Sequence, residues 1–159
     1  MENINSNSTK QYLIFVLNNE KYATKADNVQ EIVDFMNIRR VPKSNPCVKG
    51  ITNVRGDLIA VVDPKIRFGI GSIDIQKRTS FIIFNILNNK KQTILSIALM
   101  VDMVIEVDDI LPEDILQTPE FGSKIEQKYI ENIIRFDDEY ITVLDMDMVL
   151  NIPELSQIS

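Results

Sequence analysis

Two stretches of the sequence carry the same pattern, and together they indicate the fold class. Residues 50–68 are GITNVRGDLIAVVDPKIRF, and residues 132–150, in the second half of the chain, are NIIRFDDEYITVLDMDMVL. Each stretch places a tight turn between two apolar runs rich in β-branched residues, and then reaches an aspartate before a short helical segment. Asp63 and Asp145 are therefore predicted helix N-caps, because a carboxylate at that position accepts hydrogen bonds from unpaired helical N–H groups.

A second duplication lies upstream of each stretch. Residues 11–18 (QYLIFVLN) are an apolar run ending in turn residues, and residues 80–102 (SFIIFNILNNKKQTILSIALMVD) repeat this arrangement around a second Asn-Asn pair. The same spaced triplet follows each hairpin at a constant offset: Asp27, Val29 and Glu31, then Asp102, Val104 and Glu106. The order of hairpin, second hairpin and helix thus occurs twice, which predicts two similar β units.

The fold class expected from these patterns is mainly β, with two pseudo-repeated small β-barrel subdomains and a few short helices. Each half, at about 70 residues, is small for an independent core, so the halves are expected to pack on one another. The predicted helices cover residues 26–34, 64–69 and 145–151. The predicted organisation is a flexible tail over 1–10, one domain over 11–152 and a second tail over 153–159. The subdomains cover roughly 11–75 and 76–152, with exchange of strands between them left open.

The composition argues against several classes of function. The net charge is −6 and the basic residues are scattered, so a nucleic-acid partner is not expected. The chain contains no histidine, which removes the commonest general base and a common metal ligand. Cys47 is interpreted as apolar filler, and the acidic runs at 107–109 and 137–139 as solvated turns. The prediction is a non-enzymatic protein without a cofactor or a metal.

The same composition predicts a location. The single cysteine forms no intrachain disulfide, and the amino terminus lacks a basic-then-apolar signal segment. No apolar run approaches about 18 residues, the length of a membrane span. We expect a reduced cytoplasmic protein with no direct membrane insertion.

The tripeptide Arg55-Gly56-Asp57 is interpreted as a hairpin turn rather than as an adhesion motif. Gly56 accepts a positive φ between two apolar strands, and Asp57 tolerates the adjoining position. Arg55 lies just before this glycine, and Glu31 lies in the segment DNVQEIV at 27–33. These two charges are either solvated surface residues or a polar spot on a binding surface, and their spacing does not decide between the two.

Taken together, these segments resemble the CheW-like family of bacterial chemotaxis coupling proteins, over nearly the whole chain from Tyr12 to Leu150. The strongest match is VKGITNVRGDLIAVVDPKIRFGI, at 48–70. The supporting segments are YLIFVLNNEKYA (12–23), VQEIV (29–33), LMVDMVIEV (99–107), PEDI (112–115), TPEF (118–121) and YITVLDMDMVL (140–150). The resemblance implies two SH3-like β-barrel subdomains and no catalytic activity.

The resemblance also implies partners. Such a protein is expected to be monomeric when free and to bridge two proteins. One is the regulatory domain of a CheA-type histidine kinase, and the other is the cytoplasmic tip of a methyl-accepting chemoreceptor, so the adaptor is recruited to membrane receptor arrays through these partners. The alternative that stays open is a CheW-like scaffold for a histidine-kinase pathway outside chemotaxis.

Site residues carry over one position at a time. Val29, Glu31 and Arg55 match the surface that couples receptor and kinase. Lys49 and Gly50 match a Lys-Gly pair linked to kinase binding, and Phe121 matches an aromatic residue that contacts the next kinase in array rings. Gly56 is expected to have only the structural role of a turn residue.

Overall fold

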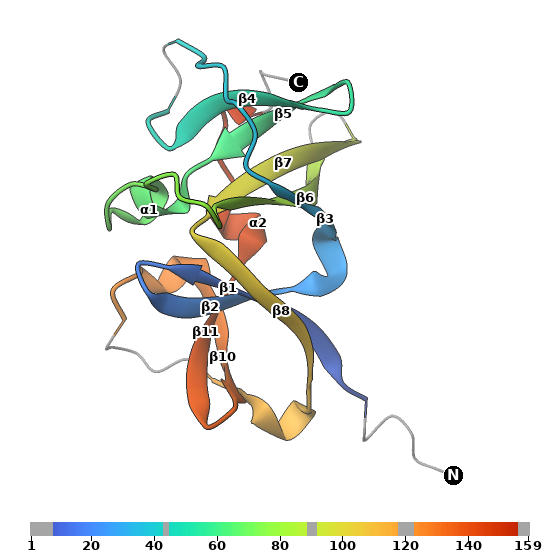
Figure 1. Ribbon diagram of the computed structural model, residues 1–159. Coiled ribbons are helices and arrows are strands. Elements are labelled where there is room, and N and C mark those ends of the chain that lie inside the picture. Colours follow the sequence, from blue (N-terminus) through green and yellow to red (C-terminus); the bar gives the residue numbers. More distant parts are fainter. Residues whose placement is uncertain (1–7, 43–44, 89–91, 118–122, 156–159) are drawn as a thin grey trace.

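Strands dominate the chain, as the sequence predicts (Figure 1). The computed structural model describes residues 8–42, 45–88, 92–117 and 123–155. Sheet A contains, in spatial order, β8 (Met103–Ile110), β1 (Lys10–Leu17), β2 (Glu20–Lys25), β11 (Glu139–Leu144), β10 (Ile130–Phe136) and β9 (Ile115–Leu116). Sheet B contains β3 (Val29–Asp34), β6 (Ser80–Asn88), β7 (Thr93–Val101), β5 (Asp57–Val62) and β4 (Val48–Val54). The mainly β class is confirmed.

Each sheet mixes strands from both halves of the chain. β3 follows the β1–β2 hairpin in sequence but pairs with β6, and β8 follows the β6–β7 hairpin but pairs with β1. The second strands of the hairpins meet in parallel, β11 beside β2 and β5 beside β7. The sequence repeat is therefore a division of the chain and not of the sheets, which lie one above the other in Figure 1.

The predicted helix over 26–34 is wrong. Only Ala26–Asn28 is helical, as the short 3-10 turn η2, and Val29–Asp34 is strand β3. Burial alternates along β3 with a period of two, which suits its β-branched residues and pairing with β6. Two further 3-10 turns are η3 (Pro112–Asp114) and η4 (Gln127–Tyr129).

The two short α-helices begin at aspartate caps. Asp63 precedes α1 (Pro64–Phe68), and its Oδ1 accepts hydrogen bonds from the N–H groups of Lys65 and Ile66 at 2.9 and 3.4 Å. Asp145 precedes α2 (Met146–Val149), and its Oδ1 accepts a bond from the Met148 N–H at 3.3 Å. Both caps satisfy N–H groups that the helix itself leaves unpaired.

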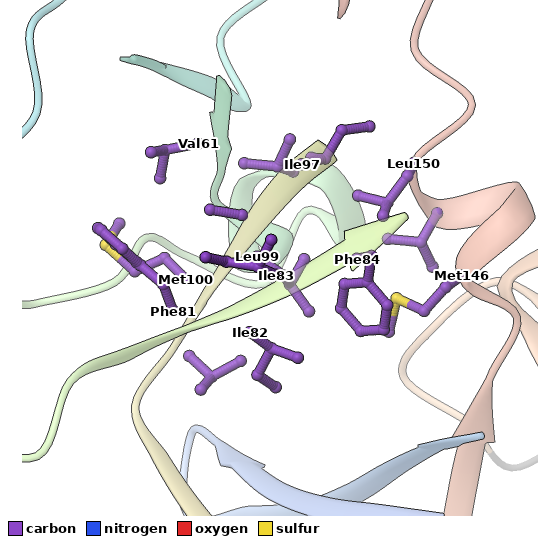
Figure 2. Close-up of a cluster of buried hydrophobic side chains, with 14 of the residues drawn as sticks. Val61, Phe81, Ile82, Ile83, Phe84, Ile97, Leu99, Met100, Met146 and Leu150 are labelled. Atoms are coloured by element: carbon purple, nitrogen blue, oxygen red, sulfur yellow. The ribbon is translucent and has the colours of Figure 1, made fainter. Parts of the chain in front are cut away.

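The main hydrophobic core is built largely on sheet B. Four consecutive residues of β6, Phe81 to Phe84, are all at most 1% exposed, so this strand is covered on both faces. In Figure 2, Met146 and Leu150 from the α2 region lie near Phe84, while Leu99 and Met100 follow the neighbouring strand. Leu13, Phe15 and Leu17 of β1 join the same cluster, so sheet A also contributes to it. Leu155 is buried in it too, so packing extends past residue 152, where the sequence places the beginning of a tail.

A second, smaller core lies within sheet A. The alternate residues of β1, Tyr12 and Ile14, face this core, which also contains Ala23, Ile110, Ile134, Ile141 and Val143. Because residues of β8 and of β10 meet in one cluster, the sheet curves so that these distant strands approach each other.

Polar contacts fasten the two sheets together. The Lys65 ammonium of α1 lies 2.9 Å from the Asp102 carboxylate, whose Oδ2 also accepts the Asn18 N–H at 2.8 Å. Lys65 is nearly buried, and Asn18 belongs to the β1–β2 turn. Arg67 donates to the backbone carbonyls of Val149, Met148 and Asn151 at the end of α2. Both contacts join segments that are distant in sequence.

The two equivalent hairpins differ in length. The β1–β2 hairpin closes after the pair Leu17–Glu20 with a two-residue turn. The corresponding pair in the β6–β7 hairpin is Ile86–Leu95, because Phe84 pairs with β3 as Phe15 pairs with β8. That hairpin continues through Leu87–Ile94 and Asn88–Thr93, and the side chains of Leu87 and Ile94 are 52% and 65% exposed.

Candidate functional site

The β4–β5 turn holds an arginine in an unusual backbone conformation. Arg55 has φ 51° and Gly56 has φ 91°, the pattern of a hairpin turn with two left-handed central residues. The Gly56 N–H donates to Asn53 Oδ1 at 2.7 Å. The left-handed residue beside Gly56 is therefore Arg55 and not Asp57, which is the first residue of β5. The expectation for Asp57 is wrong, because the turn is centred one residue earlier.

Arg55 forms an ion pair with Glu31 of β3. Its Nη2 donates hydrogen bonds to both carboxylate oxygens, and this contact raises the pKa of Arg55. The Arg55 side chain is 66% exposed and the Glu31 side chain 26%, so the pair lies on the surface with its arginine outermost. The fold thus joins the end of a hairpin to an edge strand that comes well before it in the sequence.

The equivalent place in sheet A carries the opposite arrangement of charge. Glu106 of β8 corresponds to Glu31, and Asp137 of the β10–β11 turn corresponds to Arg55, with the same φ of 51°. Desolvation, followed by the nearby carboxylates of Asp108 and Asp137, raises the pKa of Glu106, and Lys21 lowers it. Sheet A therefore presents two acids where sheet B presents an acid and a base on the same backbone.

The other expected surface residues have mixed environments. Val29 begins β3 and is half-buried against the main core, and Lys49 is half-buried at a bulge in β4. Gly50 is buried with φ 145°, and a Cβ there would lie 2.0 Å from the Arg39 carbonyl oxygen. Gly50 therefore has a structural reason to be glycine. Phe121 lies outside the described residues.

The described part of the chain shows few features of chemical catalysis. Within residues 8–42, 45–88, 92–117 and 123–155, no cluster of three or more His, Cys, Asp or Glu side chains is placed to hold a metal. Cys47 is buried, and this burial raises the pKa of its thiol. Among the helices that the structure describes, none combines the length and the apolar character needed to span a bilayer.

The sequence did not point to a polar and apolar group beside Glu31. Ser96 Oγ lies 3.2 Å from Gln30 Oε1 and 3.3 Å from Asn85 Oδ1, which connects β7 to β3 and β6. Leu87 and Ile94 continue the same face of the hairpin as Asn85 and Ser96, further toward the turn. The unequal spacing of the two hairpins in the sequence was the available clue to this extension.

These observations define a class of protein: a two-sheet β protein whose best-formed surface site is an ion pair on an exposed turn. The particular family follows from comparison with known proteins. The model of the CheW-like domain matches residues 11–154, and the chain belongs to this family.

Relatives and a solved structure agree with this assignment. The chemotaxis protein CheW of Klebsiella aerogenes is 26% identical over 92% of this chain and 85% of its own length. The chemotaxis protein CheW of Thermotoga maritima is 29% identical over 88% of this chain and 87% of its own. The crystal structure of the scaffolding protein TtCheW from Thermoanaerobacter tengcongensis superimposes with a TM-score of 0.79 at 29% identity. That superposition covers 96% of this chain and 94% of the other.

Proposed function

We propose that this protein is a non-enzymatic adaptor of chemotaxis signalling. It couples a CheA-type histidine kinase, through the regulatory domain of the kinase, to the cytoplasmic tips of chemoreceptors. Membership of the CheW-like family supports this proposal, as do relatives named as chemotaxis proteins and a similar structure described as a scaffolding protein. The adaptor works in the cytoplasm and reaches membrane receptor arrays through its partners.

The Glu31–Arg55 pair is the observation that carries the proposal. A tight turn is satisfied by aspartate at the equivalent position of sheet A, so the turn itself does not require Arg55. A long basic side chain in a left-handed conformation is energetically unfavourable, and such outliers persist chiefly at functional sites. Nη2 makes the described bonds to Glu31, while a guanidinium has five N–H donors, so an exposed arginine retains donors for a partner.

The proposed coupling surface comprises Val29, Glu31 and Arg55. Its apolar member, Val29, begins the same edge strand that carries Glu31, so a partner meets apolar and charged groups together. Lys49 and Gly50 belong to the proposed kinase contact on sheet B, with Lys49 as the side chain that reaches the partner. Phe121 belongs to the proposed contact between neighbouring units of an array ring.

Reversing the charge of Arg55 tests the proposal. We expect Arg55→Glu to weaken binding to a receptor-tip fragment or a kinase regulatory domain by about tenfold or more, as loss of an interface hot spot does. The expected cause is repulsion from Glu31 and the loss of the exposed guanidinium. Titration of both partners by calorimetry or interferometry measures this change, and thermal unfolding verifies that the variant is folded.

Arg135→Glu is the matched control, because Arg135 is an exposed hairpin arginine of sheet A paired with Asp114 at 2.9 Å. The charge change is the same, and we expect partner binding to stay near that of the unmodified protein. Unchanged binding of Arg55→Glu to both partners, in a protein of normal stability, would show that the pair is not part of the coupling surface.

A further inference from the structure

Three buried polar groups converge on the small core of sheet A. They are Tyr12 Oη on β1, Asp108 Oδ2 on β8 and Asn132 Oδ1 on β10, and none of them makes a hydrogen bond within the described part of the chain. Tyr12 is fully buried, and Asp108 is its direct cross-strand partner. Burial raises the pKa of the Tyr12 phenol, and Asn132 is close enough to lower it. The three groups therefore surround one place.

The equivalent positions in sheet B are apolar. Tyr12 corresponds to Phe81, because each pairs with the same position of the third strand. Asp108 corresponds to Val33 and Asn132 to Gly50, by the same two offsets that relate the repeats in the sequence. Three polar groups from three strands thus replace three apolar residues on the same backbone.

Sheet B fills the corresponding space with side chains. Phe35 packs on Phe81 with ring centroids 5.5 Å apart, and Ile38 lies directly against Gly50. These residues come from the segment after β3, so sheet B is closed by apolar packing. In sheet A, the polar groups of β8, β1 and β10 occupy this position instead, and a buried polar group without a partner is costly.

The hydrogen-bonding capacities of the three groups specify what satisfies them. The carboxylate and amide oxygens are acceptors, and the phenol supplies one donor hydrogen. Direct pairing among the three leaves at least one buried acceptor without a donor. One water molecule donates two hydrogens and accepts the third bond from the phenol, which matches the number of about three bonds that buried waters make. A calcium ion takes roughly six to eight oxygen ligands, about twice what these side chains offer.

We propose that Tyr12, Asp108 and Asn132 bind one internal water molecule, which connects β8 to β10 through β1 within sheet A. The site is separate from the Glu31–Arg55 surface and does not depend on the proposed function. It gives edge strand β8, which pairs in the sheet with β1, a second attachment on its inner face.

Magnetisation transfer from water in the full-length protein tests the proposal directly. Nuclear Overhauser spectra with labelled isoleucine methyl groups should show a long-lived water beside Ile14 or Ile134, the neighbours of this site in the small core. The triple variant Tyr12→Phe, Asp108→Val, Asn132→Ala should lose this cross-peak. Absence of the cross-peak from the unmodified protein would overturn the proposal.

Unfolding measurements provide an independent readout. Tyr12→Phe alone should lower the thermal midpoint, because two acceptors then share a water that has lost its third bond. The triple variant should recover most of this loss, so the three changes are not additive. The matched control is Phe81→Tyr, which adds a hydroxyl to the equivalent apolar place. It should lower the midpoint without creating a water cross-peak.

Two further outcomes count against the water. Strictly additive effects of the three substitutions would mean that the groups do not share one ligand. A midpoint that rises specifically with sodium, potassium or ammonium chloride, at equal ionic strength, would assign a cation to the site instead.

Discussion

At the scale of single residues, the left-handed turn positions distinguish structure from function. Asn18, Asn19, Asp137 and Asp138 occupy such positions, and these residue types tolerate them well. Arg55 does not belong to this group, and its ion pair with Glu31 gives the conformation a purpose. The sequence predicted the glycine of that turn, since only backbone freedom is needed to explain it. The contact with Glu31 depends on the arrangement of two strands and was not predictable from spacing.

The charge reversal between the two turns leads to a prediction about Glu106. The raised pKa of Glu106 means that the folded state favours its protonated form. Its stabilising contribution is therefore present below the ordinary glutamate pKa and is lost as the pH rises through the raised value. We expect Asp137→Arg to lower the pKa of Glu106, because a nearby carboxylate is replaced by a cation as in the Glu31–Arg55 pair. A carboxyl NMR titration of Glu106 measures the shift.

Asp138→Arg is the control for this titration, since it changes the net charge equally from the next position of the same turn. We expect a smaller effect on the pKa of Glu106. Equal shifts from both substitutions would mean that overall charge, and not the geometry of the turn, governs this group.

At the scale of secondary-structure elements, the β6–β7 hairpin is longer than its sheet A counterpart. Equivalent strands end at Leu17 and Ile86, and the residues beyond Ile86 have no equivalent in the β1–β2 hairpin. Because the shorter hairpin closes with Asn18-Asn19, the extension is not needed to connect the strands. Cross-strand pairs beyond the core contribute little when exposed, and Leu87 and Ile94 are both more than half exposed.

Shortening this hairpin should therefore leave the fold intact. We expect replacement of residues 87–94 by Asn-Asn to change the free energy of unfolding by less than about 1 kcal/mol, since exposed positions away from the core have small effects. Denaturant unfolding monitored by circular dichroism measures the change. The double substitution Leu87→Ser and Ile94→Ser is the control that keeps the length. A loss of several kcal/mol in either variant would mean that the extension belongs to the core.

At the scale of the whole molecule, buried polar contacts determine how the two sheets sit on one another. The Asp102 carboxylate receives the Lys65 ammonium of α1 and the Asn18 N–H of the β1–β2 turn. It lies between β7 of sheet B and β8 of sheet A, where the chain passes from one sheet to the other. Removing one member of such a pair leaves the other charge buried without compensation.

We expect Asp102→Asn to destabilise the protein by about 2 to 3 kcal/mol, near the lower end for buried pairs because Asp102 is partly exposed. Denaturant unfolding measures this loss. Adding Lys65→Met should restore part of the stability, because the buried charge is then removed as well. Lys124→Met is the surface control, since Lys124 pairs with Glu20 in an exposed position and its loss should leave the midpoint unchanged. A small effect of Asp102→Asn would show that packing alone orients the sheets.

Local chemistry allowed the sequence by itself to determine the hairpins, the Asp63 and Asp145 caps, the position of Gly56 and the mainly β class. Apolar alternation, turn residues and capping act over a few neighbouring residues, so they are visible without coordinates. The same local pattern misassigned 26–34, because β3 becomes a strand only by pairing with β6, which lies far along the sequence.

Only the tertiary structure decided the exchange of β3 and β8, the Glu31–Arg55 contact, the Lys65–Asp102 link and the meeting of Tyr12, Asp108 and Asn132. Each of these joins residues from different strands or helices, and a repeat in the sequence does not reveal which copy of a strand pairs with which hairpin. Two nearly equal halves bury more apolar surface as one molecule than apart, and the exchange of strands that achieves this is a property of the complete fold.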